Sequence, residues 1–265
     1  MSITIRMALE RLEELTGGKP EHTVDGLLSG DPSTPVAGIA VAFMPSHATI
    51  EKAIACGANL LIAHEGVFYS HRDAAERLNN DEVCMAKQRL IERSGIAVYR
   101  CHDGWHRRRP DGIAYGLIEK LGWTEFVESH QMAASILTLP PTTVGEAAAR
   151  LKRRLGVPML RVVGDLAMPC RRVGLLVGYR GGGDTAIPLL EQERLDLVVA
   201  GEGPEWETPE YVRDAVRQGR SKALILLGHA ASEEPGMAFL AERLQAACPE
   251  VPVRYLRDEP LFQWI

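Results

Sequence analysis

The sequence predicts an α/β protein with mostly parallel, mixed sheets. The first observation is a set of short, wholly apolar runs that read as strands buried on both faces, such as residues 60–63, 197–200 and 223–227. The second is that stretches with helical spacing separate these runs, the alternation typical of βαβ units. The third is that several runs end in histidine or glutamate, at the edge where open α/β sheets bind ligands.

Composition limits the classes of function. A chain of 265 residues can form one large or two modest domains. The net charge of −5 and the short basic cluster 107–109 give no support for a nucleic-acid surface. Five cysteines without a CxxC motif indicate reduced thiols and a cytoplasmic setting. Because no apolar run approaches the ~20 residues that span a bilayer, and no signal segment is recognisable, we expect a soluble protein without a membrane partner.

The first part of the chain reads as a βαβ unit with additions. A helix is expected over 5–15, stopped by Gly17 and Gly18, and a strand end and turn over 24–32. The strands 36–43 and 60–63, joined by the helix 46–56, should be parallel. Three further elements follow after a polar loop: a helix over 81–94, a strand over 96–100 and a helix over 112–121.

The βαβ alternation is interrupted over residues 124–170, which predicts an inserted or second-domain αβ element. It comprises a strand at 134–139, a helix at 144–155 and a strand at 160–163. The βαβ alternation then resumes, with strands expected at 173–177, 197–200, 223–227 and 253–256, helices up to 193 and over 208–218, and a last helix starting at Pro235.

Three predicted strand ends carry side chains that can bind metals. His64 and Glu65 follow the first, and His102, Asp103 and His106 follow the second. His229 and Glu233 follow the third, in the turn before the helix expected from Pro235. Imidazole and carboxylate suit Zn, Fe, Mn, Co or Ni. A single catalytic ion needs about three protein ligands, so five converging groups point to two ions ~3.5–4 Å apart.

Each of these side chains could instead have a purely structural role. Any single histidine could cap a helix or form a hydrogen bond at the sheet edge. The glycine turn 181–183 could bind an anion or serve as a tight turn, and Glu202, Glu205 and Glu207 could face the cleft or form a solvated loop. Four histidines lack supporting spacing and are expected in surface loops: His22, His47, His71 and His130.

Five segments occur in the order and spacing of a known family. They are GLLSGDP, HEGVFY after a strand, YRCHDGWH, the glycine turn followed by DLVVAGE, and GHAASEEPG. The chain thus resembles the Nif-three-like dinuclear-metal-centre family, also described as GTP cyclohydrolase I type 2-like, over nearly its whole length. The resemblance implies two similar three-layer α/β/α domains, a Nif-three-like fold, a toroidal homohexamer and two divalent transition-metal ions per subunit.

The family's ligands map onto this chain with two departures. His64 matches the first histidine, and His229 and Glu233 match the final pair. Glu65 stands where the family has a second histidine, and His106 stands where it has aspartate. We expect the metal ligands His64, Glu65, His106, His229 and Glu233, in a cleft between a domain of residues 1–125 plus 236–265 and a domain of residues 126–235. His102 matches a histidine just outside the usual ligand set.

The function expected from this centre is metal-dependent hydrolysis. The reaction would open a heterocyclic ring or cleave a non-peptide C–N bond in a cyclic amide or purine-type small molecule. Glu65 and Glu233 are the candidate base and bridging carboxylate, and His102 would protonate the leaving nitrogen. The alternatives are a non-catalytic, metal-binding or regulatory hexameric ring and a phosphoesterase. A pocket lined by Trp105, Phe68 and Tyr69 beside the ions would favour an enzyme.

Overall fold

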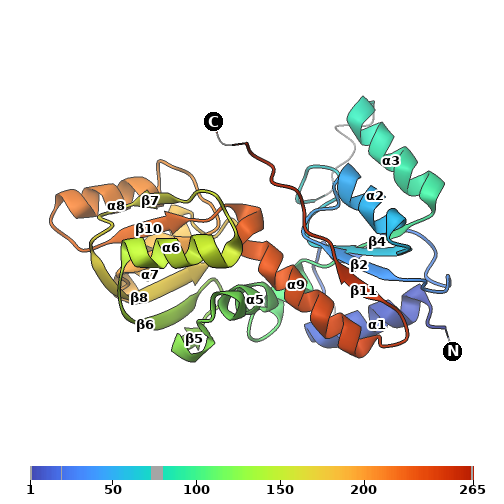
Figure 1. Cartoon of the computed structure of the whole chain (residues 1–265), viewed down its shortest axis with the longest axis horizontal. Coiled ribbons are helices and arrows are strands. Elements are labelled where there is room, and N and C mark those ends of the chain that lie inside the picture. Colours follow the sequence, from blue (N-terminus) through green and yellow to red (C-terminus); the bar gives the residue numbers. More distant parts are fainter. Residues whose placement is uncertain (1, 19, 73–79, 264) are drawn as a thin grey trace. The chain divides into compact units, whose positions relative to one another are not determined.

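The computed structural model describes residues 2–18, 20–72, 80–263 and 265. It divides into two compact units, Met1–Arg108 with Met237–Ile265, and Arg109–Gly236 (Figure 1). The sequence placed the first boundary at 125/126, whereas in the structure α5 (Gly112–Leu121) belongs to the second unit. α5 packs against α6 (Val144–Leu155), and a Cβ on Gly116 would lie 2.6 Å from the Gly236 backbone of the same unit.

The first unit is built on a five-stranded sheet with the order β1-β4-β3-β2-β11. The predicted βαβ unit is confirmed, because β2 and β3 are parallel. β4 and β11 are also parallel to their neighbours, and β1 is antiparallel to β4. The strands are β1 (Gly26–Ser29), β2 (Ile39–Ala42), β3 (Leu60–Ala63), β4 (Ala97–Arg100) and β11 (Val253–Tyr255).

Helices cover both faces of this sheet (Figure 1). α2 (His47–Ala55) and α3 (Glu82–Ser94) share a buried cluster with alternate residues of β2, β3 and β4, and α1 (Ile5–Thr16) lies on the opposite face. The helix ends follow the local sequence. The Ser46 side chain caps α2, Asp81 caps α3, and Gly95 ends α3 at a left-handed φ of 66°.

The second unit has a six-stranded sheet with the order β5-β6-β8-β9-β10-β7. β8, β9 and β10 are parallel to one another, and β5, β6 and β7 pair antiparallel. α7 (Gly183–Gln192) and α8 (Thr208–Arg217) contribute to the cluster on one face. The strands are β5 (Val127–His130), β6 (Ser135–Thr143), β7 (Arg161–Val163), β8 (Pro169–Leu176), β9 (Leu197–Ala200) and β10 (Ala223–Leu226).

Two expectations for this unit are wrong. The strand predicted over 134–139 does not end there, because β6 continues through Pro140 and Pro141 with a register shift between Thr138 and Thr142. The last helix does not start at Pro235, because α9 covers His229–Ala247 and holds that proline in its interior. Its first turn closes where Ser232 N donates to Gly228 O at 3.1 Å.

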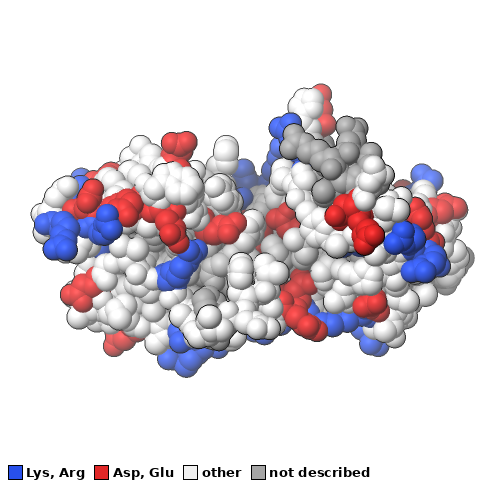
Figure 2. Space-filling model, turned by 90° about the horizontal axis from the view of Figure 1, so that it is seen from above, with Lys and Arg blue, Asp and Glu red and all other residues white. Residues whose placement is uncertain are grey.

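The cysteines, the helices and the surface charges bear on three expectations from composition. All five cysteines are free thiols, as predicted. Among the described helices none combines the length and apolar character that crossing a membrane requires. On the face drawn in Figure 2, basic and acidic side chains are intermingled rather than gathered into a broad basic patch.

Candidate metal centre

Three histidines of the first unit meet at the carboxyl ends of β3 and β4. His64 directly follows β3, His102 follows β4, and His106 lies on the short helix α4 (Asp103–Arg107). The ring centroids are 4.4 Å apart for His64 and His102, 5.0 Å for His64 and His106, and 4.9 Å for His102 and His106. A metal–nitrogen distance of about 2.0–2.1 Å places imidazoles that share one ion roughly 4.5–5.5 Å apart. The spacing therefore fits a single ion held by three imidazoles.

Hydrogen bonds select the nitrogen that each of two histidines offers. His64 Nδ1 lies 3.1 Å from the Cys101 carbonyl oxygen, which can only accept, so Nδ1 carries the proton. His102 Nδ1 lies 2.9 Å from Asp103 Oδ1. An outer carboxylate or carbonyl on the second nitrogen is the usual arrangement of metal-binding histidines. The metal-binding role therefore falls to Nε2 of both rings.

Asp103 and Cys101 beside these histidines have pKa values shifted in directions that favour metal binding by the imidazoles. Burial raises the pKa of Asp103, but its hydrogen bonds with His102, the Val24 amide and Thr23 outweigh burial, and the net pKa lies below the usual value. Burial raises the pKa of the Cys101 thiol well above its usual value. Asp103 thus remains a carboxylate acceptor for His102, and Cys101 remains a thiol rather than a thiolate ligand.

Asp25 fixes the start of α4. Its Oδ1 accepts from the amides of His102 and Asp103, each at 2.8 Å, and its Oδ2 accepts from the Gly104 amide at 2.7 Å. A Cβ on Gly104 would lie 3.0 Å from Asp25 Oδ2, so a larger residue would crowd this contact. Because His102 and His106 are four residues apart around this turn, Asp25 sets the positions of both rings. The sequence interpretation missed this role.

Glu65 and His71 lie beside the three histidines. The ligand atoms of Glu65, His71 and His102 lie within 4.8 Å of one another, as do those of His64, His102 and His106. Glu65 Oε2 also accepts from Arg100 Nη2 at 3.3 Å. His71 lies exposed in a turn, as expected for a loop histidine, but its ring centroid also lies 4.9 Å from that of His102. Nothing in its local sequence spacing indicated this.

A second set of donors lies in the second unit. His229 and Glu233 belong to the first turn of α9 rather than to a preceding turn, and their i, i+4 spacing places them on one helix face. His229 Nε2 lies 3.1 Å from Glu233 Oε2, a separation that suits two ligands of one ion. His229 Nδ1 lies 2.9 Å from Glu202 Oε1, so Glu202 supports the ring as an outer carboxylate.

Gly178 makes room for the Glu233 carboxylate. It has a φ of +60°, and a Cβ at this position would lie 2.2 Å from Glu233 Oε1. The Gly178 amide donates to Ser232 Oγ at 2.9 Å, and Ser232 Oγ donates to the His229 carbonyl at 2.7 Å. These contacts hold the end of β8 against the first turn of α9.

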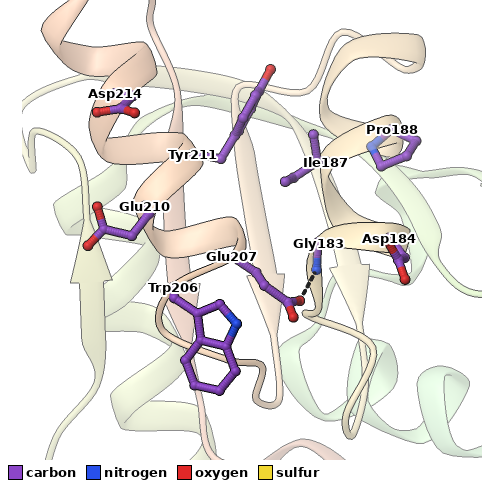
Figure 3. A pocket seen from close by; sticks show the side chains of 9 residues that line it. All are labelled: Gly183, Asp184, Ile187, Pro188, Trp206, Glu207, Glu210, Tyr211 and Asp214. Atoms are coloured by element: carbon purple, nitrogen blue, oxygen red, sulfur yellow. Dashed lines mark hydrogen bonds between the residues drawn. The ribbon is translucent and has the colours of Figure 1, made fainter.

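The second unit also has an open pocket of about 680 Å³ lined by residues of α7 and α8 (Figure 3). Glu207 fills the anion position of the predicted glycine turn, because its Oε2 accepts from the Gly183 amide at 2.6 Å. Glu205 instead pairs with Arg161 at the surface. The pocket is lined by Gly183, Asp184, Ile187, Pro188, Trp206, Glu207, Glu210, Tyr211 and Asp214.

The predicted site residues fall into two groups, one in each unit. His64, Glu65, His102 and His106 form one cluster in the first unit, and His229 and Glu233 form a pair in the second. Trp105 is fully buried and stacks on Phe239 with a centroid distance of 5.8 Å.

The chain matches the family model described as Duf34/NIF3 (NGG1p interacting factor 3) over residues 5–260. A protein of Chlamydia trachomatis named "GTP cyclohydrolase 1 type 2 homolog" is 27% identical over 252 residues, covering 91% of this chain and 94% of its own length. A protein of the same name from Clostridium perfringens is 23% identical, covering 83% of this chain and 82% of its own length.

Solved structures share the fold. The Bacillus cereus protein related to NIF3 superposes with a TM-score of 0.80 at 15% identity, covering 100% of this chain and 99% of its own. A hypothetical protein of Staphylococcus aureus gives a TM-score of 0.78 at 17% identity over the whole of both chains.

Proposed function

Because the chain belongs to the Duf34/NIF3 family, we propose that it is a metal-dependent hydrolase. The reaction is the opening of a heterocyclic ring, or the cleavage of another non-peptide C–N bond, in a cyclic amide or purine-type substrate. The observation that carries the proposal is the group of His64, His102 and His106, whose ligand atoms lie within 4.8 Å of one another. The names of the Chlamydia and Clostridium relatives support the substrate class.

The chemistry of the donor set fits a divalent transition-metal ion. Three imidazoles with outer oxygen partners suit Zn, Fe, Co, Ni or Mn, and three protein ligands leave a coordination position for water or substrate. When bound, such an ion polarises a substrate carbonyl or amidine and lowers the pKa of a water molecule.

The chain's own residues have three tasks in this proposal. His64, His102 and His106 hold the ion through their ring nitrogens, and the Cys101 carbonyl and Asp103 orient two of these rings. Glu65 serves as the base that accepts a proton from the attacking water. The sequence assigned proton donation to His102, but its bond with Asp103 and its place in the cluster support a ligand role instead.

The second unit contributes a further ligand pair. The 3.1 Å separation of His229 Nε2 and Glu233 Oε2 supports metal binding by this pair. The family resemblance alone predicts that His64, Glu65, His106, His229 and Glu233 serve one dinuclear centre; in the present proposal Glu65 is the base instead of a ligand. The expected content is close to two ions per chain.

Metal analysis of the purified full chain tests the proposal. We expect close to two transition-metal ions per chain after reconstitution and dialysis, and at least tenfold weaker binding in His64→Ala and His106→Ala. His47→Ala is the matched control, because its side chain is 47% exposed on α2, and its metal content should equal that of the wild type. A wild-type chain that binds no ion after reconstitution contradicts the proposal.

Turnover separates an enzyme from a binding protein. The metal-loaded chain is screened against cyclic amides and purine nucleotides, and hydrolysis should disappear in His64→Ala but persist in His47→Ala. Full metal occupancy without turnover of any of these substrates would favour the non-catalytic, metal-binding ring.

A further inference from the structure

Arg100 supplies a buried positive charge beside the three-histidine group. It is the last residue of β4, and only 1% of its side chain is exposed. Its Nη2 lies 3.3 Å from Glu65 Oε2 and 3.4 Å from His71 Nδ1. Its Nε donates to the His64 carbonyl at 3.2 Å, and its Nη1 donates to the His71 carbonyl. The guanidinium is therefore anchored on both sides of the space that Glu65 and His71 share.

By residue type and spacing, Glu65, His71 and His102 could hold a metal ion, because their ligand atoms lie within 4.8 Å of one another. Such an ion would lie beside the guanidinium, and two positive charges repel strongly where burial lowers the local dielectric. Arg100 cannot leave easily, since a buried arginine without its carboxylate carries an uncompensated charge. The negative charge of Glu65 is thus already compensated by Arg100, whose Nη2 also lies 3.4 Å from His71 Nδ1.

We propose that Arg100 takes the place of a metal ion at Glu65 and His71, so that Glu65 is held by arginine and is not a metal ligand in this chain. The inference rests on the proposed metal binding at His64, His102 and His106. It makes Arg100 a positioning residue, which keeps one carboxylate oxygen of Glu65 engaged and thereby fixes the group that serves as base.

The segment that carries His71 is held in the same way by a second buried cation. Lys87 of α3 is 1% exposed, and its Nζ donates to the Val67 carbonyl at 2.8 Å and lies 4.4 Å from the centre of the Tyr69 ring. Two cations, Arg100 and Lys87, therefore fix the chain between Val67 and His71. This tether explains why a histidine in a polar loop lies next to His102.

Glu65→Gln is the first test, because glutamine keeps an oxygen that can accept from Arg100 but is a poor metal ligand. We expect the metal content of the variant to equal that of the wild type, its zinc affinity to stay within about twofold, and the visible spectrum of its cobalt form to be unchanged. Loss of an ion, or at least a tenfold loss of affinity of the kind expected for His106→Ala, would overturn the inference.

Arg100→Gln is the second test, read by metal content and circular dichroism. It leaves the Glu65 carboxylate without its cation, so the folded variant should bind one more ion per chain than the wild type. Adding His71→Ala should remove that extra ion. A folded Arg100→Gln variant with unchanged metal content overturns the inference, and if this variant does not fold, Glu65→Gln decides alone. Failure of the proposed metal binding is distinguishable, because the wild type would then bind no ion, and failure of the proposed hydrolysis is read separately by turnover.

Discussion

Replacing Asp25 by alanine should disturb the metal centre from outside its ligand set. The residue is 8% exposed, and its side chain accepts from three backbone amides at the start of α4, those of His102, Asp103 and Gly104. A buried donor that loses its partner costs about 1–3 kcal/mol. Three such losses sum to roughly 3–9 kcal/mol, and because water can enter the vacated space we expect about 3–5 kcal/mol of lost stability.

The same change should weaken metal binding. Removing an outer partner of a metal site typically costs about 10–100-fold in affinity, and here the turn that carries both His102 and His106 loses its anchor. Urea unfolding of the metal-free chain gives the stability, and competition with a chromophoric chelator gives the zinc affinity. Asp31→Ala is the control, because Asp31 accepts from Ser33 in an exposed turn and should leave both quantities nearly unchanged. A loss in Asp25→Ala below about 1 kcal/mol with unchanged zinc affinity would refute this role of Asp25.

Four further outcomes are expected. His229→Ala and Glu233→Ala should each reduce the metal content while circular dichroism stays that of the wild type. Gly178→Ala should lower the melting temperature sharply or prevent folding, since its Cβ would lie 2.2 Å from Glu233 Oε1, and soluble expression with an unchanged melting temperature would contradict this. Hydrogen bonds from Arg11 lower the pKa of Glu250 to about 2. The stabilisation that this lowered pKa provides is present above the pKa of the unfolded chain and is lost as pH falls from about 4.5 toward 2. Glu250→Gln should therefore flatten the pH dependence of the free energy of unfolding in this range. Sedimentation should give a hexamer, as the family resemblance implies, and a monomer at micromolar concentration would contradict it.

Local sequence determined most elements of the fold. The strand 60–63 and the helices 112–121 and 144–155 have the bounds that the sequence predicts, because the strand is a wholly apolar run and each helix combines an apolar pattern with a capping residue and a stop glycine. The family resemblance is confirmed by the match over residues 5–260. The sequence alone predicts a start of α9 that is too late, because proline is typical of a first helical position, whereas the structure holds Pro235 in the interior of the helix.

The candidate site was predicted only in part, because the missing contacts connect residues far apart in sequence. Asp25 caps a turn that lies 77 residues further along the chain, and Arg100 reaches Glu65 from 35 residues away. The position of a residue after a strand and the HxxxE spacing identify candidate ligands from local sequence. They do not show which buried side chain from elsewhere in the chain contacts those ligands. The contact between His71 and His102 is not predictable for the same reason, since Arg100 at the end of β4 binds the carbonyl of His71.

The central claim is that His64, His102 and His106 hold one ion, and an anomalous difference map from crystals of the reconstituted chain tests it most directly. Data collected on both sides of the absorption edge of the bound metal identify the element and locate it. We predict a peak about 2.0–2.1 Å from a ring nitrogen of each of the three histidines, with Glu65 still paired to Arg100. A peak bonded to Glu65 and His71 instead, or no peak at the three histidines in fully reconstituted crystals, would contradict the account.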